Sequence, residues 1–349
     1  MAKRLRIAVC LCLALAAVPV QSAQEELPSL PEPTSNNAVA MIETDNGARI
    51  YSFQGLLSGK RWSDIHARTW AYDAGQWSEL DPVPVREGRL AGAAIGIDDV
   101  VWLFGGYTVA EDGAEVSTPE VFRLNSGDRK MEHVSDMPIP VDDMAVFAYQ
   151  GRYIYLVSGW HDLGNVNLVQ VLDTRTMAWS QATPYPGAPV FGHAGGLYGG
   201  TLLLCGGVRI EYPEDGSPRR FLPSRECWLG EIDSSDFRRI AWQSAAHHPG
   251  PARYRAAAVA DDSGHVVFAG GTDNPYNFDG IGYNGIPSAP LANIVRFNIK
   301  SLRWDQPLEL SEPSMDHRAL LFRDGWFYLV GGMLRGQRVS DRVLRFRLD

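Results

Sequence analysis

The sequence predicts an all-β fold, a six-bladed β-propeller with four-stranded blades, closed into a ring by its N-terminal strand. Three observations predict it. An apolar strand that ends in glycine recurs six times, a tryptophan or methionine marker follows five of these strands, and the last unit lacks a strand that the N-terminus resembles. Repeats of this length bury a core only when neighbouring units stack. We therefore expect residues 24–349 to form one domain.

The glycine-ended strands set the period of the repeat. They end at Gly55, Gly106, Gly159, Gly207, Gly271 and Gly332. The intervals are 51, 53, 48, 64 and 61 residues, near the period of about 50 residues known for one class of propeller. Glycine suits a positive φ or a close approach of two strands. We interpret these glycines as backbone features.

The markers and the third strands complete each unit. The markers are Trp77, Met131, Trp179, Trp242 and Trp304. A proline stands seven residues after the first four of them, at Pro84, Pro138, Pro186 and Pro249, and Ser311 takes this place after the fifth. Before each marker, an apolar strand ends at Asp73, Asn125, Asp173, Asp233 or Asn298, residues typical of hairpin turns. Each unit is thus predicted to be four antiparallel strands, with the tryptophans packed between blades.

Ring closure follows from the two ends of this stretch. The last unit stops at its third strand, near Asp349. When Gln24 is aligned with the marker position, Pro31 falls on Pro84 and Ala38 falls on Ala91 without a gap. We expect residues 24–34 to form the outer strand of the last blade, because an open ring would leave a sheet edge unpaired.

The glycine doublets, spaced tryptophans and Asp-ended third strands resemble the kelch repeat, and the resemblance covers essentially all of residues 24–349. In length and export, the chain is similar to bacterial kelch proteins such as the N-acetylneuraminate epimerase (mutarotase) family. The last blade, LVGGMLRGQRVSDRVL, is the stretch most like that family. This resemblance implies a kelch-type propeller that interconverts sugar anomers in the periplasm.

The first 23 residues have the layout of a secretory signal peptide. Lys3, Arg4 and Arg6 precede an apolar run from residue 7 to 20, and small residues follow at Ser22 and Ala23. We expect export, with the periplasm as the compartment, and no membrane span. Removing this segment shifts the formal net charge from −9 to about −12, which disfavours nucleic acid as a partner.

The mature chain is predicted to need no cofactor and no metal. His247 and His248 are adjacent, so in an extended segment their side chains point apart. Cys205 ends the second strand of the fourth blade and Cys227 begins its third, so antiparallel pairing brings them together. They form either a cross-strand disulfide or two buried thiols.

The candidate site lies where the six chain segments enter the innermost strands, because a propeller gathers these segments at one end of its central channel. The loops between second and third strands emerge on the same face, and two of them, about Val208 to Glu226 and Thr272 to Leu291, are long. The predicted ligand-binding residues are Asn36, Arg89, Phe191, Tyr254, Arg255, Asp273, Asn274, Tyr276 and Asn277. The alternative is that the junction residues only join neighbouring blades through salt bridges and hydrogen bonds.

Three functions fit this prediction. The first is binding of a small polar ligand, a carbohydrate or sugar acid, at the channel mouth. The second is the mutarotase activity that the resemblance implies, with His317, Asp143 and Asp316 exchanging protons and Arg89 and Arg255 holding a substrate carboxylate. The third is a protein-interaction scaffold, which predicts an extended exposed apolar patch.

Overall fold

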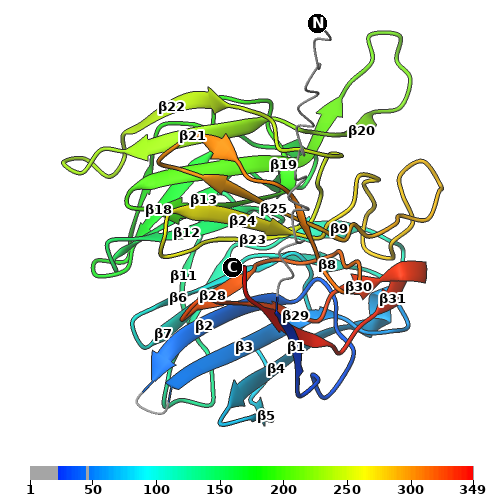
Figure 1. Ribbon diagram of the computed structural model, residues 1–349. Helices are drawn as coiled ribbons and strands as arrows, with labels where there is room; N and C mark the ends of the chain where they lie inside the picture. Colours follow the sequence, from blue (N-terminus) through cyan, green and yellow to red (C-terminus); the bar gives the residue numbers. More distant parts are fainter. Residues whose placement is uncertain (1–22, 45–46, 349) are drawn as a thin grey trace, which may run out of the picture.

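The computed structural model describes residues 23–44 and 47–348, so the predicted signal peptide lies outside the described residues except for Ala23. The described chain forms six antiparallel sheets, each with a main path of four strands, arranged around a central axis (Figure 1). The predicted six-bladed kelch-type propeller is confirmed. Within these residues, no helix is both long enough and apolar enough to cross a membrane.

The first three blades each follow the chain from the inner strand to the outer one. Blade 1 consists of β2 (Ala38–Thr44), β3 (Gly47–Leu56), β4 (Ile65–Asp73) and β5 (Gln76–Leu80). Blade 2 consists of β6 (Ala93–Ile97), β7 (Val100–Phe104), β10 (Glu120–Asn125) and β11 (Glu132–Asp136). Blade 3 consists of β12 (Ala145–Tyr149), β13 (Tyr153–Val157), β16 (Val169–Asp173) and β17 (Ala178–Gln181).

The remaining blades repeat this order, and the last one takes its outer strand from the N-terminus. Blade 4 consists of β18 (Phe191–Tyr198), β19 (Thr201–Glu211), β21 (Cys227–Ile232) and β22 (Ile240–Ala245). Blade 5 consists of β23 (Ala257–Ala260), β24 (His265–Ala269), β25 (Asn293–Asn298) and β26 (Arg303–Trp304), and β27 (Leu308–Glu309) also pairs with β25. Blade 6 consists of β28 (Leu321–Arg323), β29 (Trp326–Val330), β32 (Val343–Phe346) and β1 (Gln24–Leu27).

Ring closure occurs as predicted, although the closing strand is shorter than expected. β1 pairs antiparallel with β32, with Gln24 opposite Phe346. The regular strand ends at Leu27, whereas residues 24–34 were expected to form it. Pro28, Pro31 and Pro33 lack the N–H that a ladder needs. Residues 28–34 still follow the blade, since the Leu30 N–H donates to the Asp341 carbonyl at 2.7 Å.

Four short hairpins extend from the blades on one side of the propeller, which we call the mouth side (right in Figure 1). They are β8 (Tyr107–Val109) with β9 (Glu115–Ser117), β14 (Trp160–His161) with β15 (Gly164–Asn165), the end of β19 with β20 (Arg220–Pro223), and β30 (Met333–Leu334) with β31 (Arg338–Val339). The 3-10 turns η1 (Trp62–Asp64) and η2 (Arg335–Gln337) lie in blades 1 and 6. The predicted loop of blade 4 is therefore largely a hairpin.

The outer-strand tryptophans join each blade to the preceding one. The Trp179 indole N–H donates to Ser135 Oγ at 2.9 Å, and Trp242 donates to the Thr183 carbonyl at 3.2 Å. Trp77 reaches the Pro28 carbonyl at 2.8 Å, which links blade 1 to the closing segment of blade 6. Burial of the ring with its N–H satisfied explains why tryptophan recurs at the period of the repeat.

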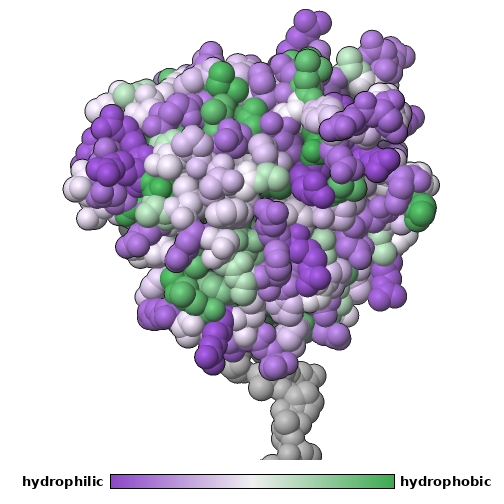
Figure 2. Space-filling view, turned by 90° about the horizontal axis from the view of Figure 1, so that it is seen from above, coloured by the Kyte–Doolittle hydropathy of each residue, from purple (hydrophilic) through white to green (hydrophobic). Residues whose placement is uncertain are grey.

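A disulfide joins the second and third strands of blade 4. Cys205 in β19 lies opposite Cys227 in β21, with a Cα–Cα distance of 4.2 Å. Both residues are buried. The bond closes the base of the β19–β20 hairpin, which extends over the mouth side. On the face in Figure 2, hydrophilic side chains predominate and hydrophobic ones form small separate groups.

Candidate functional site

A ring of hydrogen bonds surrounds the channel axis, formed by the chain segments that directly precede the six inner strands. One residue from each blade has a positive φ there: Asn36, Ala91, Asp143, Gly192, Arg255 and Asp316, with values from 49° to 65°. The ring is closed by Asp143 N to Ala91 O (3.0 Å), Gly192 N to Asp143 O (2.9 Å), Arg255 N to Gly192 O (2.8 Å), His317 N to Arg255 O (3.1 Å), Asn36 N to Asp316 O (3.1 Å) and Ala91 N to Asn36 Oδ1 (2.8 Å).

This ring shows that the gapless alignment of the junctions was off by one or two residues in three blades. Twelve residues after the marker position, where Asn36 stands in the N-terminal segment, the sequence has Arg89, Phe191 and Tyr254 in these blades. In the structure, Ala91, Gly192 and Arg255 hold that place. The junctions differ slightly in length, which a spacing count from the marker does not detect. Arg89 instead turns away from the axis, where its guanidinium pairs with Glu120 at 2.8 Å.

A buried ion cluster fills the axis at the ring. The Arg255 guanidinium pairs with Asp143 at 2.6 Å and with Asp316 at 3.2 Å, and Arg318 also pairs with Asp143. All four side chains are at most 3% exposed. Tyr276 donates its hydroxyl hydrogen to Asp316 at 3.0 Å. Removing one partner of a buried ion pair costs about 3–5 kcal/mol, so this cluster is first a structural element.

The cluster shifts the pKa values of its two aspartates in opposite directions. Burial alone would raise the pKa of Asp143, but the guanidinium groups of Arg255 and Arg318 outweigh it and lower that pKa. Burial raises the pKa of Asp316 despite Arg255. His317 lies nearby and is buried, with its Nε2 atom 2.7 Å from Ser314 Oγ, and burial lowers its pKa to about 4.

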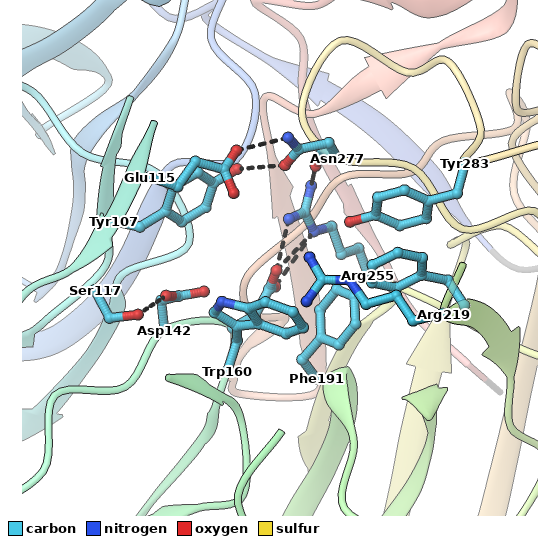
Figure 3. Close-up of a pocket in the computed structure, with 12 residues that line it drawn as sticks. Tyr107, Glu115, Ser117, Asp142, Trp160, Phe191, Arg219, Arg255, Asn277 and Tyr283 are labelled. Carbon is cyan, nitrogen blue, oxygen red and sulfur yellow. Dashed lines mark hydrogen bonds and ion pairs between the residues drawn. The ribbon is translucent and has the colours of Figure 1, made fainter. Parts of the chain in front are cut away.

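On the mouth side of this cluster is a cavity of about 270 Å³ (Figure 3). Its walls come from blades 2, 3, 4 and 5, mainly from the hairpins and from the segment after Gly271. The lining residues are Tyr107, Glu115, Ser117, Asp142, Asp143, Trp160, Phe191, Arg219, Phe221, Arg255, Asn277 and Tyr283. We call this cavity the mouth pocket.

Two carboxyl groups define one wall of the mouth pocket. Asp142 is 3% exposed, and its Oδ2 atom accepts a hydrogen bond from Ser117 Oγ at 2.7 Å. Burial, reinforced by neighbouring Asp143, raises the pKa of Asp142 well above its usual value. Glu115 accepts a hydrogen bond from Asn277 Nδ2 at 2.6 Å, and desolvation by the surrounding protein raises its pKa too. Carboxyl groups whose pKa is raised in a pocket are candidates for proton exchange with a ligand.

Aromatic rings and one arginine define the other wall. Phe221 and Tyr283 stack face to face with ring centroids 3.7 Å apart, and Trp160 packs edge-on against Phe191 at 5.5 Å. The Arg219 guanidinium lies 5.1 Å from the centroid of Trp160. The stacked pair joins the β19–β20 hairpin to the segment after Gly271, so both long loops of the prediction contribute to one wall.

The structure brings some predicted site residues together here and places others elsewhere. Phe191, Arg255, Asn277 and Asp143 line the mouth pocket. Asn36 is in the axial ring, and Tyr254 is buried with its hydroxyl bonded to the Tyr276 carbonyl at 2.9 Å. Asn274 bonds within its own loop, to the Ile286 carbonyl at 2.9 Å, and Asp273 is exposed. Arg89, Asp316 and His317 are not among the lining residues of the pocket.

Sequence reasoning missed Asp142, Glu115, Trp160, Arg219 and Phe221. A signal existed for four of them, because Glu115, Trp160, Arg219 and Phe221 lie in the loops between the second and third strands of blades 2, 3 and 4. The loops of blades 2 and 3 emerge on the same face as the two long ones, but they are shorter and have no length signal. Asp142 has no such signal, because the periodic spacing points to Asp143, its neighbour in the chain.

Comparison with known proteins supports the kelch-type propeller. No family model matches the chain. Kelch-like protein 15 of Gallus gallus is 30% identical over 134 residues, which are 38% of this chain and 26% of that protein. Kelch domain-containing protein 3 of Rattus norvegicus is 25% identical over 278 residues, 74% of this chain and 67% of that protein. The chain thus spans about a quarter of the first relative's length.

Among solved structures, the structure of YjhT superimposes with a TM-score of 0.71 and 18% sequence identity. The match covers 91% of this chain and 96% of that one. At this identity the likeness concerns the fold. Since fold and chemistry separate readily on such scaffolds, function has to be argued from the mouth pocket.

Proposed function

We propose that this kelch-type β-propeller binds a saccharide or sugar acid in the mouth pocket. The observation that carries the proposal is the combination of the two walls. Trp160 and Tyr283 offer aromatic rings that can stack on the apolar face of a sugar, and Glu115, Asp142 and Asn277 offer oxygen and amide groups that pair with hydroxyls. An apolar wall with a few convergent polar groups is typical of small-molecule sites.

The size of the pocket supports a small ligand. Its volume of about 270 Å³ lies just below the range of roughly 300–1,000 Å³ common for drug-sized ligands. The buried cluster of Arg255, Asp143 and Asp316 forms a rigid base, since each of its members is held by at least one ion pair. A ligand that enters from the mouth side therefore meets preformed polar groups, which lowers the entropic cost of binding.

A second candidate function, sugar mutarotation, is favoured by the two protonatable carboxyl groups. In this reaction a protonated carboxyl donates its proton to the ring oxygen, and an ionised one takes the proton of the anomeric hydroxyl. The bond between the anomeric carbon and the ring oxygen breaks as the carbonyl forms, and closure from the other face yields the second anomer. Asp142 and Glu115 take these roles in our proposal, in place of His317 and Asp316.

The proposed setting is outside the cytoplasm, where the predicted signal peptide would deliver the mature chain. The secreted form should begin near residue 23 or 24. Mass spectrometry of protein recovered from the periplasm of a bacterial host measures this directly, and an intact N-terminus on exported material would contradict the proposal.

Binding is tested with a thermal-shift screen of the mature protein against neutral sugars, amino sugars and sugar acids. A ligand that binds the folded state raises the melting temperature. Trp160→Ala should weaken binding by roughly tenfold through loss of stacking. Trp326→Ala is the matched control, since Trp326 lies in β29 and packs on Arg345 and Arg347, away from the pocket. A panel without any shift would contradict the proposed function.

Mutarotation needs a separate measurement. NMR of a freshly dissolved single anomer follows its equilibration, which the wild type should accelerate and Asp142→Asn should slow. Binding without acceleration would remove the enzymatic candidate and leave the binding function in place.

A further inference from the structure

The mouth pocket is polarised by charge. Asp142 and Glu115 lie along one wall, while Arg219 reaches over Trp160 from the opposite side, where Tyr283 lies (Figure 3). The two ends of a bound molecule therefore meet surroundings of opposite sign. Opposite charges on facing walls orient a ligand that carries both signs.

The acidic wall has an unused acceptor. Only Oδ2 of Asp142 accepts a hydrogen bond from the described residues, and Oδ1 points into the pocket (Figure 3). Within the described chain, neither Asp142 nor Glu115 forms an ion pair, because the neighbouring Arg255 is paired with Asp143 and Asp316. Ser117 holds Asp142 in place and is itself fixed, since its Oγ accepts the Asp162 N–H at 3.1 Å.

The opposite wall has an unused cation. Arg219 forms no ion pair with any carboxylate that the structure describes, and its guanidinium donates to the Leu163 carbonyl at 3.1 Å. Its position is nevertheless defined, because it lies against Trp160 at 5.1 Å and Phe221 at 5.3 Å. Stacking on aromatic faces leaves the remaining N–H groups in the guanidinium plane available to an anion.

We propose that the ligand of the mouth pocket is a zwitterion, with a protonated amine against Asp142 and Glu115 and a carboxylate against Arg219. The sugar part of this inference rests on the proposed saccharide function. Together they make the ligand an amino sugar acid. An ammonium group supplies three donors to the two carboxylates. A ligand carboxylate accepts paired hydrogen bonds from Arg219.

A neutral sugar would leave these charges uncompensated. When Asp142 is ionised, the hydroxyls of a neutral sugar would cover its carboxylate without neutralising it, and the sugar would screen Arg219 from water without pairing with it. Covering a charge without pairing it costs free energy, whereas charge-assisted hydrogen bonds are about twice as strong as neutral ones. The arrangement therefore selects for the doubly charged ligand.

The test compares four sugars by calorimetry at one pH and one salt concentration. They are muramic acid (amine and carboxylate), glucosamine (amine alone), glucuronic acid (carboxylate alone) and glucose (neither). Muramic acid should bind roughly tenfold or more tightly than either singly charged sugar. Phenylalanine, a zwitterion without a sugar, is included to separate the charge pattern from the sugar.

Two variants assign the charges to residues. Asp142→Asn should abolish the advantage of muramic acid over glucuronic acid while keeping its advantage over glucosamine. Arg219→Gln should do the reverse. Glu115→Gln provides a second, independent test of the acidic wall.

The outcomes distinguish this inference from the proposed function. If glucose binds as tightly as muramic acid, or if both variants leave the ratios unchanged, the charge inference is wrong and saccharide binding stands. If phenylalanine binds and none of the sugars does, the charge pattern stands and the saccharide proposal fails. Failure of all five compounds to bind overturns both.

Discussion

Asp142 and Asp143 are neighbours in the chain but have opposite electrostatic environments. Asp143 faces Arg255 and Arg318, and these guanidinium groups lower its pKa. Asp142 forms no ion pair within the described residues, and burial raises its pKa well above the usual 3.8. One residue therefore stabilises the axis, while the other is available for chemistry at the mouth. Neighbouring titratable groups whose pKa values are shifted in opposite directions are typical of functional sites.

This difference predicts opposite effects of the same substitution. Below pH 3.8 Asp142 is protonated in both states and contributes nothing. As the pH rises above that value, the unfolded chain loses the proton first, so ionisation costs the folded state stability. Asp142→Asn should therefore raise the melting temperature near pH 7 and leave it unchanged well below pH 3.8. Asp143→Asn should lower the melting temperature at pH 7, because breaking this buried ion pair reduces the unfolding free energy by about 3–5 kcal/mol.

Thermal unfolding across this pH range measures both variants. If Asp142→Asn destabilised the protein at pH 7 as much as Asp143→Asn, both aspartates would be structural, and the role of Asp142 at the mouth would lose its basis.

At the scale of elements, the outer strands decide how blades are joined. β1 is only four residues long, yet it completes blade 6 through its ladder with β32. Its charged side chains add exposed ion pairs, Glu25 with Arg345 and Glu26 with Arg342. Exposed pairs of this kind contribute about 0–1 kcal/mol each, so the backbone ladder carries most of the stabilisation.

Deleting residues 24–27 should therefore lower the unfolding free energy by about 1 kcal/mol for each backbone hydrogen bond lost. Urea denaturation measures this loss. The matched control is Glu25→Gln combined with Glu26→Gln, which keeps the strand and removes the ion pairs, and it should stay close to the wild type. Equal stability of the deletion and the wild type would contradict closure through β1.

At the scale of the whole molecule, the mouth pocket depends on the closed ring. Its walls come from four blades, and its base comes from ion pairs that join Asp143 in blade 3, Arg255 in blade 5 and Asp316 in blade 6. The two ends of the described chain meet, since the Arg347 N–H donates to the Ala23 carbonyl at 2.9 Å. The ring is thus closed by a blade whose strands come from both ends of the chain.

Two circular permutants test this closure, each with residues 23 and 348 joined by a short linker. Opening the chain between β10 and β11 leaves the outer strand of blade 2 at the new N-terminus and its other strands at the new C-terminus. This arrangement recreates the natural closure, so this permutant should melt near the wild type. Opening it near residue 87, between blades 1 and 2, leaves every blade complete but removes the interlock. That permutant should melt at a lower temperature, because only contacts between blades 1 and 2, such as the hydrogen bond from the Arg129 guanidinium to the Glu79 carbonyl, hold the ends of the ring. Equal melting temperatures would show that the interlock does not stabilise the ring.

The sequence by itself determined the propeller, the number of blades and the N-terminal closure. These features depend on local structural requirements that recur in each repeat of the sequence. The glycine at the end of a second strand is one, since Gly106 has a φ of 91° and an added Cβ would lie 2.6 Å from the Leu90 carbonyl. The tryptophans that bond to the preceding blade are another. Each requirement is met within one or two adjacent blades, so it leaves a periodic trace.

The tertiary structure alone decided which polar residues form the site. Arg255, a predicted ligand-binding residue, lines the pocket, and its guanidinium also pairs with Asp143 from two blades away. Asp142 faces the pocket because a one-residue shift separates it from the axial ring. Glu115, Trp160 and Arg219 converge from three different hairpins. Such contacts depend on the relative rotation of blades and on junction lengths that differ by one or two residues, and neither leaves a periodic signal in the sequence.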